Sequence, residues 1–203
     1  MKMSIKKYNA SITLMCLLVA SLIWLLTPSG IYNFARPMLL SGGGEMCIKS
    51  LQERNIQHFK LGDLGSGNCP IRNAVRVIEF SQTRPSKPMV LSCPTVIALD
   101  DWFAEANVKT FKHAGTVNCR KVRGSRVQSE HSYGTAIDII SIDGVPIKKR
   151  WDIQGSESQK LKKAAKLACN HFSNVLTPET NSLHHDHFHF DIGIGAVCGK
   201  RRF

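Results

Sequence analysis

The longest apolar run of the chain extends from Ala10 to Leu26, and lysines precede it at positions 2, 6 and 7. Its length is at the short end of the range that spans a bilayer and is long for a signal-peptide core. The bulky Ile23-Trp-Leu-Leu26 and the lack of a clean small-residue cleavage site favour an uncleaved signal anchor over a cleaved signal peptide. Because lysines mark the cytoplasmic side, this pattern predicts a cytoplasmic N-terminus over 1–7, a transmembrane helix over 8–27, a linker over 28–45 and a periplasmic domain over 46–203, held at a bacterial inner membrane.

The hydrophobic pattern after this run predicts helices mixed with short strands. Pro94 suits the first turn of a helix with apolar stripes at helical spacing, and Asp143-Gly144 is a strong hairpin signal between β-rich segments. The predicted helices cover 47–56, 94–107 and 156–172, the last capped by Ser156; the predicted strands cover 74–80, 116–122, 136–142, 145–147 and 183–192, and glycine-rich turns run to residue 67. This mixture predicts an α+β fold with a small antiparallel sheet flanked by helices.

The charge of the chain points to an anionic partner. Hydrophobic content of 43% and 21% charged residues are ordinary for a globular protein, but the net charge of +12 and the pI near 9.6 are not. We find no Cys-x-x-Cys pair, glycine-rich phosphate loop or long arginine-rich run, so nucleic acid is not expected as a partner. An anionic membrane or a cell-wall polymer remains.

Six cysteines lie beyond the apolar run, at positions 47, 69, 93, 119, 169 and 198. They are even in number and lack the close pairs of a structural zinc site, so we expect disulfides in an exported domain. Six cysteines allow 15 pairings, and their spacing does not choose among them.

Four histidines crowd into six positions, at 184, 185, 187 and 189. In a strand, alternate side chains share a face, so His187, His189 and Asp191 should lie opposite Phe188 and Phe190. The phenylalanines favour the core, which leaves the histidines facing a cleft. Two histidines on one face stand about 6.5–7 Å apart, so one can bind a metal while the other contacts the substrate or the attacking water.

A second segment, Ser129 to Asp138, supplies a histidine and a carboxylate at positions 131 and 138. Gly134 permits a tight chain reversal after His131. Two histidines and one carboxylate are a ligand set typical of zinc, with a fourth position left for water. The two segments together therefore predict a zinc site and metallopeptidase chemistry.

The pattern Ser129-x-His131-x-x-Gly134-x-Ala136-Ile137-Asp138 with His187-x-His189 resembles the lysostaphin-like, D-Ala-D-Ala-metallopeptidase and Hedgehog-related zinc peptidases. Cys69-Pro70, Cys93-Pro94 and Asn118-Cys-Arg120 add a closer resemblance to the extensin-like C-terminal family. This resemblance implies a zinc-dependent peptidoglycan (murein) peptidase that remodels the cell wall, with His131, Asp138 and His189 as zinc ligands.

The resemblance also ranks the remaining site candidates. Related carboxypeptidases place a glutamate three residues before the last ligand, where this chain has Asp186; the endopeptidases use histidines, here His187 and His184. His187 is therefore the first candidate for the general base, His184 the second and Asp186 the third. His185 is as easily explained as a surface histidine. Arg120 and Arg123 are candidates for binding an oxyanion or a substrate carboxylate, and Ser129 for supporting a zinc ligand.

These patterns leave several functions open. The enzyme can be a D,D-endopeptidase, an L,D-endopeptidase or a D,D-carboxypeptidase. The histidine pattern favours an endopeptidase. A non-catalytic cell-wall-binding zinc domain and a periplasmic metal-binding protein are the alternatives. Trimming of peptidoglycan close to the inner membrane would suit the insertion of an envelope-spanning assembly.

Overall fold

A computed structural model describes residues 44–199 and the backbone of 201–202. The segments predicted over 1–7 and 8–27, and all but the last two residues of the linker predicted over 28–45, lie outside the described residues. Gly44 and Glu45 already belong to the first helix described, so the domain begins slightly before position 46. Within the described part of the chain, no helix has the length and apolar character needed to cross a bilayer.

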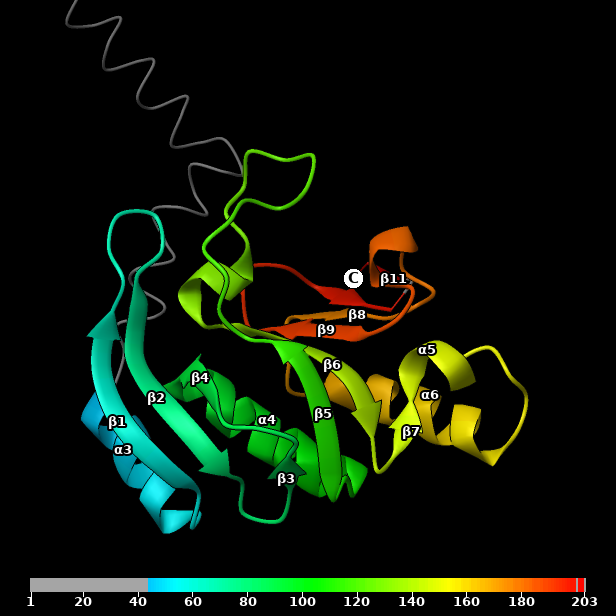
Figure 1. The fold of residues 1–203 in the computed structure, drawn as a ribbon, viewed down its shortest axis with the longest axis horizontal. Helices are drawn as coiled ribbons and strands as arrows, with labels where there is room; N and C mark the ends of the chain where they lie inside the picture. The colour runs from blue at the N-terminus through cyan, green and yellow to red at the C-terminus, as the bar shows by residue number, and fades with distance from the viewer. Residues whose placement is uncertain (1–43, 200, 203) are drawn as a thin grey trace, which may run out of the picture. The chain divides into compact units, whose positions relative to one another are not determined.

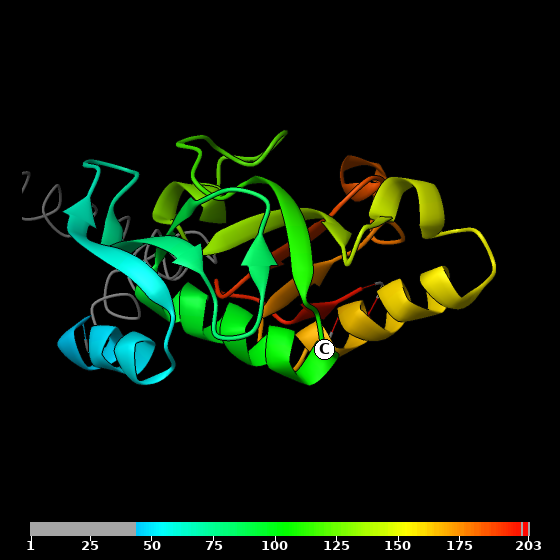
Figure 2. The same cartoon turned by 60° about the horizontal axis from the view of Figure 1, so that its bottom comes forward.

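Three longer helices lie in one layer against the strands (Figures 1 and 2). Pro94 stands in the first turn of its helix, as predicted, and Asn107 ends that helix in the left-handed conformation. The helix predicted from Ser156 forms, although Gly155 occupies the N-cap position and the helix ends earlier than expected. The helices are α3 (Gly44–Glu53), α4 (Cys93–Ala106), α5 (Ile147–Arg150) and α6 (Ser156–Ala168), with 3-10 turns η1 (Glu130–Tyr133) and η2 (Ser182–His184).

The strands form two sheets, which confirms the α+β class but not a single small antiparallel sheet. One sheet has the order β1-β2-β4 and is antiparallel. The other is mixed: its order is β11-β10-β8-β9-β6-β5-β3 with β7 beside β6, and the pairs β8–β10 and β3–β5 are parallel. The strands are β1 (Gln57–Leu64), β2 (Ile71–Glu79), β3 (Arg84–Pro85), β4 (Met89–Ser92), β5 (Thr110–Gly115), β6 (Ala136–Ile142), β7 (Val145–Pro146), β8 (Asn174–Leu176), β9 (Phe188–Asp191), β10 (Val197–Cys198) and β11 (Arg201–Arg202).

Two segments differ from their predicted structure, the first because it pairs with β2 and the second because its apolar residues are not buried. The turns expected after residue 56 are instead β1, an edge strand in which Phe59 is 63% exposed. The strand predicted over 116–122 is irregular, and Val117 and Val122 stay largely exposed. Apolar and β-branched residues favour a strand only where one face packs against a neighbour.

The core joins α4 and α6 to the two central strands of the mixed sheet. Trp102 of α4 packs edge-on against Phe190 of β9, with ring centroids 5.0 Å apart. Its indole N–H donates to the carbonyl of Ala164 in α6 at 2.9 Å. Phe188 and Phe190 are fully buried, which holds the opposite face of β9 in a fixed position. That opposite face carries His189 and Asp191.

The six cysteines form three disulfides, as expected for an exported domain. Cys47–Cys93 joins α3 to α4, Cys69–Cys119 joins the segment before β2 to the segment after β5, and Cys169–Cys198 joins the end of α6 to β10. Each is expected to stabilise the fold by roughly 2–4 kcal/mol.

Candidate metal centre

The pairing of β6 with β9 brings the first two predicted ligands together. In this antiparallel pair Asp138 lies directly opposite His189. Residues directly opposite each other on one sheet face have neighbouring side chains, and Asp138 Oδ1 lies 2.9 Å from His189 Nδ1. Strand register alone therefore brings together Asp138 and His189, which are 51 positions apart in the sequence.

The third predicted ligand, His131, comes from the 3-10 turn before β6. Gly134 ends that turn with φ of 64°, and a Cβ there would lie 2.8 Å from the Ile71 side chain and 3.1 Å from the backbone nitrogen of Ser92. Only glycine meets both the left-handed conformation and the close approach. The reversal places His131, itself 3% exposed, above the start of β6.

The three donor atoms lie close enough together to hold one metal ion. His131 Nε2 lies 3.2 Å from Asp138 Oδ1 and 3.2 Å from His189 Nδ1, which completes a triangle with the 2.9 Å pair. Tetrahedral zinc with bonds of about 2.0–2.1 Å separates neighbouring ligand atoms by about 3.3 Å. His131, Asp138 and His189 could therefore hold a divalent cation.

The electrostatics of the cluster fit a cation. Burial opposes the charged form of Asp138, but hydrogen bonds with His131 and His189 outweigh it and hold the pKa of this carboxyl well below its usual range. Burial also disfavours a charged His189, yet its contacts with Asp138 and Asp191 raise the pKa of the ring to about 9. Both shifts show that the charges around the cluster favour a positive charge at this position.

His187 lies next to the triangle, as the sequence predicted for a general base. Its Nε2 is 3.6 Å from Asp138 Oδ1. A regular strand would have placed the Asp186 side chain on the face opposite His187. That expectation is wrong, because β9 begins only at Phe188 and residues 185–187 form a turn and a bend. The Asp186 carboxylate accepts a hydrogen bond from His187 Nδ1 at 2.8 Å, so the proton is held on Nδ1 and the lone pair lies on Nε2, toward the site.

The other two histidines of the cluster, His184 and His185, differ in position: His184 lies beside the site and His185 lies on the surface. His184 lies with its ring centroid 5.2 Å from that of His187 and 5.6 Å from that of His189. Burial, together with the neighbouring His189 and His187, lowers its pKa to about 4, so the ring is neutral at neutral pH. His185 is exposed and contacts the Ser182 carbonyl, which agrees with its interpretation as a surface histidine.

Arg120 and Arg123 belong to an exposed hairpin, Asn118–Gln128, which we call the basic hairpin. It also carries Lys121 and Arg126, and it projects from the domain as a light green loop in Figure 1. Its base is attached to η1, because Asn118 N donates to the His131 carbonyl at 3.1 Å and Ser129 N to the Arg120 carbonyl at 2.9 Å. None of its four cations makes an ion pair with another described residue, so their charge remains available to a ligand.

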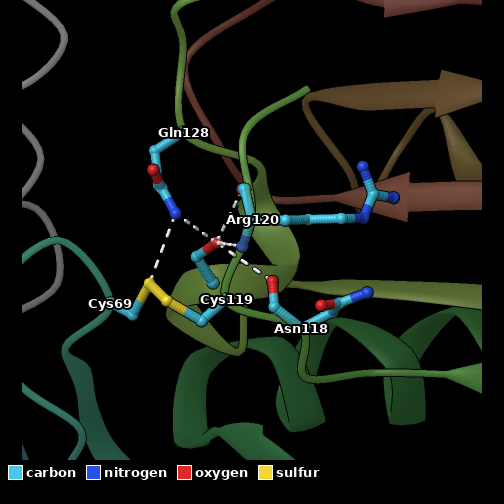
Figure 3. Close-up of a disulfide and its surroundings, with 6 residues drawn as sticks. Cys69, Asn118, Cys119, Arg120 and Gln128 are labelled. Carbon is cyan, nitrogen blue, oxygen red and sulfur yellow. Dashed lines mark hydrogen bonds between the residues drawn. A yellow bond between two sulfur atoms is a disulfide. The ribbon is translucent and has the colours of Figure 1, made fainter. Parts of the chain in front are cut away.

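A disulfide and a buried hydroxyl hold the basic hairpin in place (Figure 3). Cys119 is bonded to Cys69, and Gln128 Nε2 lies 3.3 Å from the sulfur of Cys69. Ser132, next to His131, contacts Arg120 N, the Asn118 carbonyl and Gln128 Nε2 through its hydroxyl at 2.9–3.1 Å. Figure 3 shows the Arg120 side chain pointing away from the disulfide. Ser132 therefore organises the base of the basic hairpin. Ser129, the sequence candidate for supporting a zinc ligand, is also buried, and its hydroxyl makes no cap hydrogen bond to η1.

Two further carboxyl groups lie behind the site and were not predicted as functional. Asp191 contacts His189 Nε2 at 3.0 Å. Burial and the nearby Asp191 raise the pKa of Glu130 to about 8, and Thr135 Oγ1 donates to it at 2.6 Å. The sequence signal for Asp191 was its place on the histidine face of the strand; Glu130, one position before a ligand, carried none.

The fold and the cluster define a disulfide-bonded α+β domain with a His–Asp–His site able to hold a metal ion. The chain belongs to the family described as extensin-like protein C-terminus, whose model matches residues 45–199. No curated protein and no solved structure matches the chain. The extensin-like resemblance seen in the sequence is therefore confirmed, and the further link to zinc peptidases belongs to the proposal below.

Proposed function

We propose that the protein is a zinc-dependent peptidase that cleaves peptide stems or cross-links of peptidoglycan, most simply as an endopeptidase. The observation that carries this proposal is the convergence of His131 Nε2, Asp138 Oδ1 and His189 Nδ1 within 3.2 Å of one another. The neighbouring His187 supports hydrolysis rather than metal storage, because a storage site needs no base beside its ligands.

A zinc ion held by these three residues would polarise the scissile carbonyl and lower the pKa of a bound water toward about 7. His187 receives a proton from the attacking water at Nε2 and returns it to the amine nitrogen as the peptide C–N bond breaks. Asp186 keeps His187 in the required tautomer through the 2.8 Å hydrogen bond to Nδ1. His184, neutral at neutral pH, lines the same space and is the second candidate for this proton transfer.

The basic hairpin is proposed to bind the free carboxylates of peptidoglycan stems. Arg120→Gln and Arg123→Gln are each expected to raise KM for a soluble muropeptide about 1.4- to fivefold, because an exposed charge contact contributes roughly 0.2–1 kcal/mol. The effect should shrink as salt rises. Steady-state kinetics at low and high salt measures it, with Lys163→Gln of α6, an exposed cation without an ion pair among the described residues, as the control. An equal rise in KM for Lys163→Gln would point to net charge rather than to the hairpin.

The proposed location is the periplasmic side of a bacterial inner membrane, with residues 8–27 as the anchor. Six cysteines paired as three disulfides support an oxidising compartment. Anchoring would confine cleavage to peptidoglycan near the membrane, where an envelope-spanning assembly needs an opening.

The proposal is tested by digesting purified murein sacculi with the full-length protein and identifying released muropeptides by mass spectrometry. We expect cleavage that stops on chelation and returns with zinc. The mass of the products identifies the bond, and so distinguishes an endopeptidase from a D,D-carboxypeptidase. Zinc retention with no turnover of any muropeptide would instead identify a wall-binding domain, and undiminished cleavage in chelator would overturn the zinc mechanism.

A further inference from the structure

Asp191 is held in one orientation behind His189. Its Oδ1 accepts hydrogen bonds from Asn174 Nδ2 and from Gly193 N, both at 2.8 Å. Its Oδ2 lies 3.0 Å from His189 Nε2. Asn174 stands directly opposite Asp191 in the β8–β9 pair, so strand register fixes this partner too. The carboxylate is 4% exposed, and both of its oxygens are committed.

This arrangement determines which nitrogen of His189 can bind a cation. Each ring nitrogen of His189 faces a carboxylate: Nε2 faces Asp191 Oδ2 and Nδ1 faces Asp138 Oδ1. Only Nδ1 also lies beside His131 Nε2, so a cation bound by the three residues would displace a proton from Nδ1, while the Asp191 carboxylate, which only accepts hydrogen bonds, keeps the remaining proton on Nε2. In His131 the Thr116 carbonyl accepts a hydrogen bond from Nδ1 at 3.2 Å. Its Nε2 therefore faces Asp138 and His189 with the lone pair that a cation would bind.

We propose that Asp191 is a positioning residue that fixes the His189 tautomer and thereby tunes metal affinity. This inference rests on the proposed zinc site. A buried carboxylate costs desolvation energy and is weak evidence for stability, whereas a hydrogen bond from a ligand histidine to a carboxylate orients the ring and raises its basicity. The turn after Asp191 is closely packed as well: a Cβ at Gly193 would lie 2.4 Å from the Glu130 carboxyl group.

Asp191→Asn tests the tautomer directly in the full-length protein. The asparagine Oδ1 can keep both hydrogen bonds, but its amide then donates to His189 Nε2 and moves the ring proton to Nδ1, the metal-binding atom. We expect the zinc dissociation constant, measured by competition with a chromophoric chelator, to rise about 10- to 100-fold. The absorption spectrum of the Co²⁺-loaded protein should change as well.

Asp100→Asn is the matched control. Asp100 is also 4% exposed and is hydrogen-bonded to Ser81 and Arg54, within α4 rather than at the site. We expect this variant to lower the melting temperature without changing the zinc dissociation constant. A purely structural role of Asp191 would make the two variants behave alike.

The outcomes separate the inference from the proposed function. If the wild-type protein does not bind zinc tightly, the proposed function fails. If the wild type binds and Asp191→Asn binds equally well, the positioning role is overturned. Should Asp191→Asn not fold, ¹H–¹⁵N spectra of the zinc-loaded wild type decide: the inference requires a proton on His189 Nε2 and metal on Nδ1, and the opposite arrangement contradicts it.

Discussion

Replacing His189 with alanine is expected to remove tightly bound zinc and to lower the rate of muropeptide hydrolysis by more than about 10³-fold. The loss of a Lewis acid forfeits several kcal/mol of transition-state stabilisation, and each 1.36 kcal/mol is tenfold in rate. His131→Ala and Asp138→Ala should have the same combined effect, because each removes one corner of the triangle of donor atoms. Metal content by mass spectrometry and hydrolysis of a purified muropeptide measure both quantities on the same samples.

His185→Ala is the control for this series. His185 belongs to the same histidine cluster but is exposed, and among the described residues its polar contacts are the Ser182 carbonyl and Asp186. Its replacement should leave both zinc content and hydrolysis unchanged. If His185→Ala loses zinc as readily as His189→Ala, the cluster binds metal through an exposed surface, and the buried triangle is not the site. Circular dichroism on each variant separates loss of ligand from loss of fold.

The faces of β9 could be predicted from the sequence because strand periodicity is a simple rule, whereas the choice of His131, Asp138 and His189 as ligands came from the family resemblance. Alternation predicted that Phe188 and Phe190 face the core while His189 and Asp191 face the other way, and both phenylalanines are fully buried. The position of Gly134 predicted a tight approach of the chain after His131, and a Cβ there would lie only 2.8 Å from the Ile71 side chain. Neither rule needs knowledge of distant partners.

The same rules failed where the chain leaves regular structure. Alternation placed Asp186 on the face opposite His187, but a turn before β9 brings the two side chains together. The role of Ser132 was not predicted either: its hydroxyl joins Asn118, Arg120 and Gln128 at the base of the basic hairpin. Such networks depend on tertiary contacts, and no local pattern distinguishes one buried serine from another.

The disulfide pairing shows a third kind of limit. An even number of cysteines predicted oxidation, but the partner of each cysteine depends on which elements become neighbours. Cys69 meets Cys119 because the segment before β2 lies beside the segment after β5. The disulfide thus holds the base of the basic hairpin, where Asn118 N donates to the His131 carbonyl, and spacing could not reveal either contact.

Replacing His187 with alanine is expected to lower kcat for muropeptide hydrolysis about 10²- to 10⁴-fold while zinc stays bound, because proton transfer by a positioned base contributes a factor of this size. His187 is close to the metal triangle, with Nε2 at 3.6 Å from Asp138 Oδ1, but it is not one of the three converging donors. This separation of turnover from metal content distinguishes His187 from His189. Steady-state kinetics with parallel metal analysis measures it.

His184→Ala and Asp186→Ala complete the argument by ranking the three candidates. Asp186 acts through His187 in our scheme, so its loss should reduce kcat less than the loss of His187 itself, and the double variant should be no slower than His187→Ala alone. Residues that act as one unit are not additive in this way. If Asp186→Ala slows hydrolysis as much as His187→Ala and the double variant multiplies the two effects, the carboxylate acts independently. If His184→Ala alone has the largest effect, proton transfer belongs to the histidine in η2, and His187 serves the ring packing that its 5.2 Å centroid separation from His184 already shows.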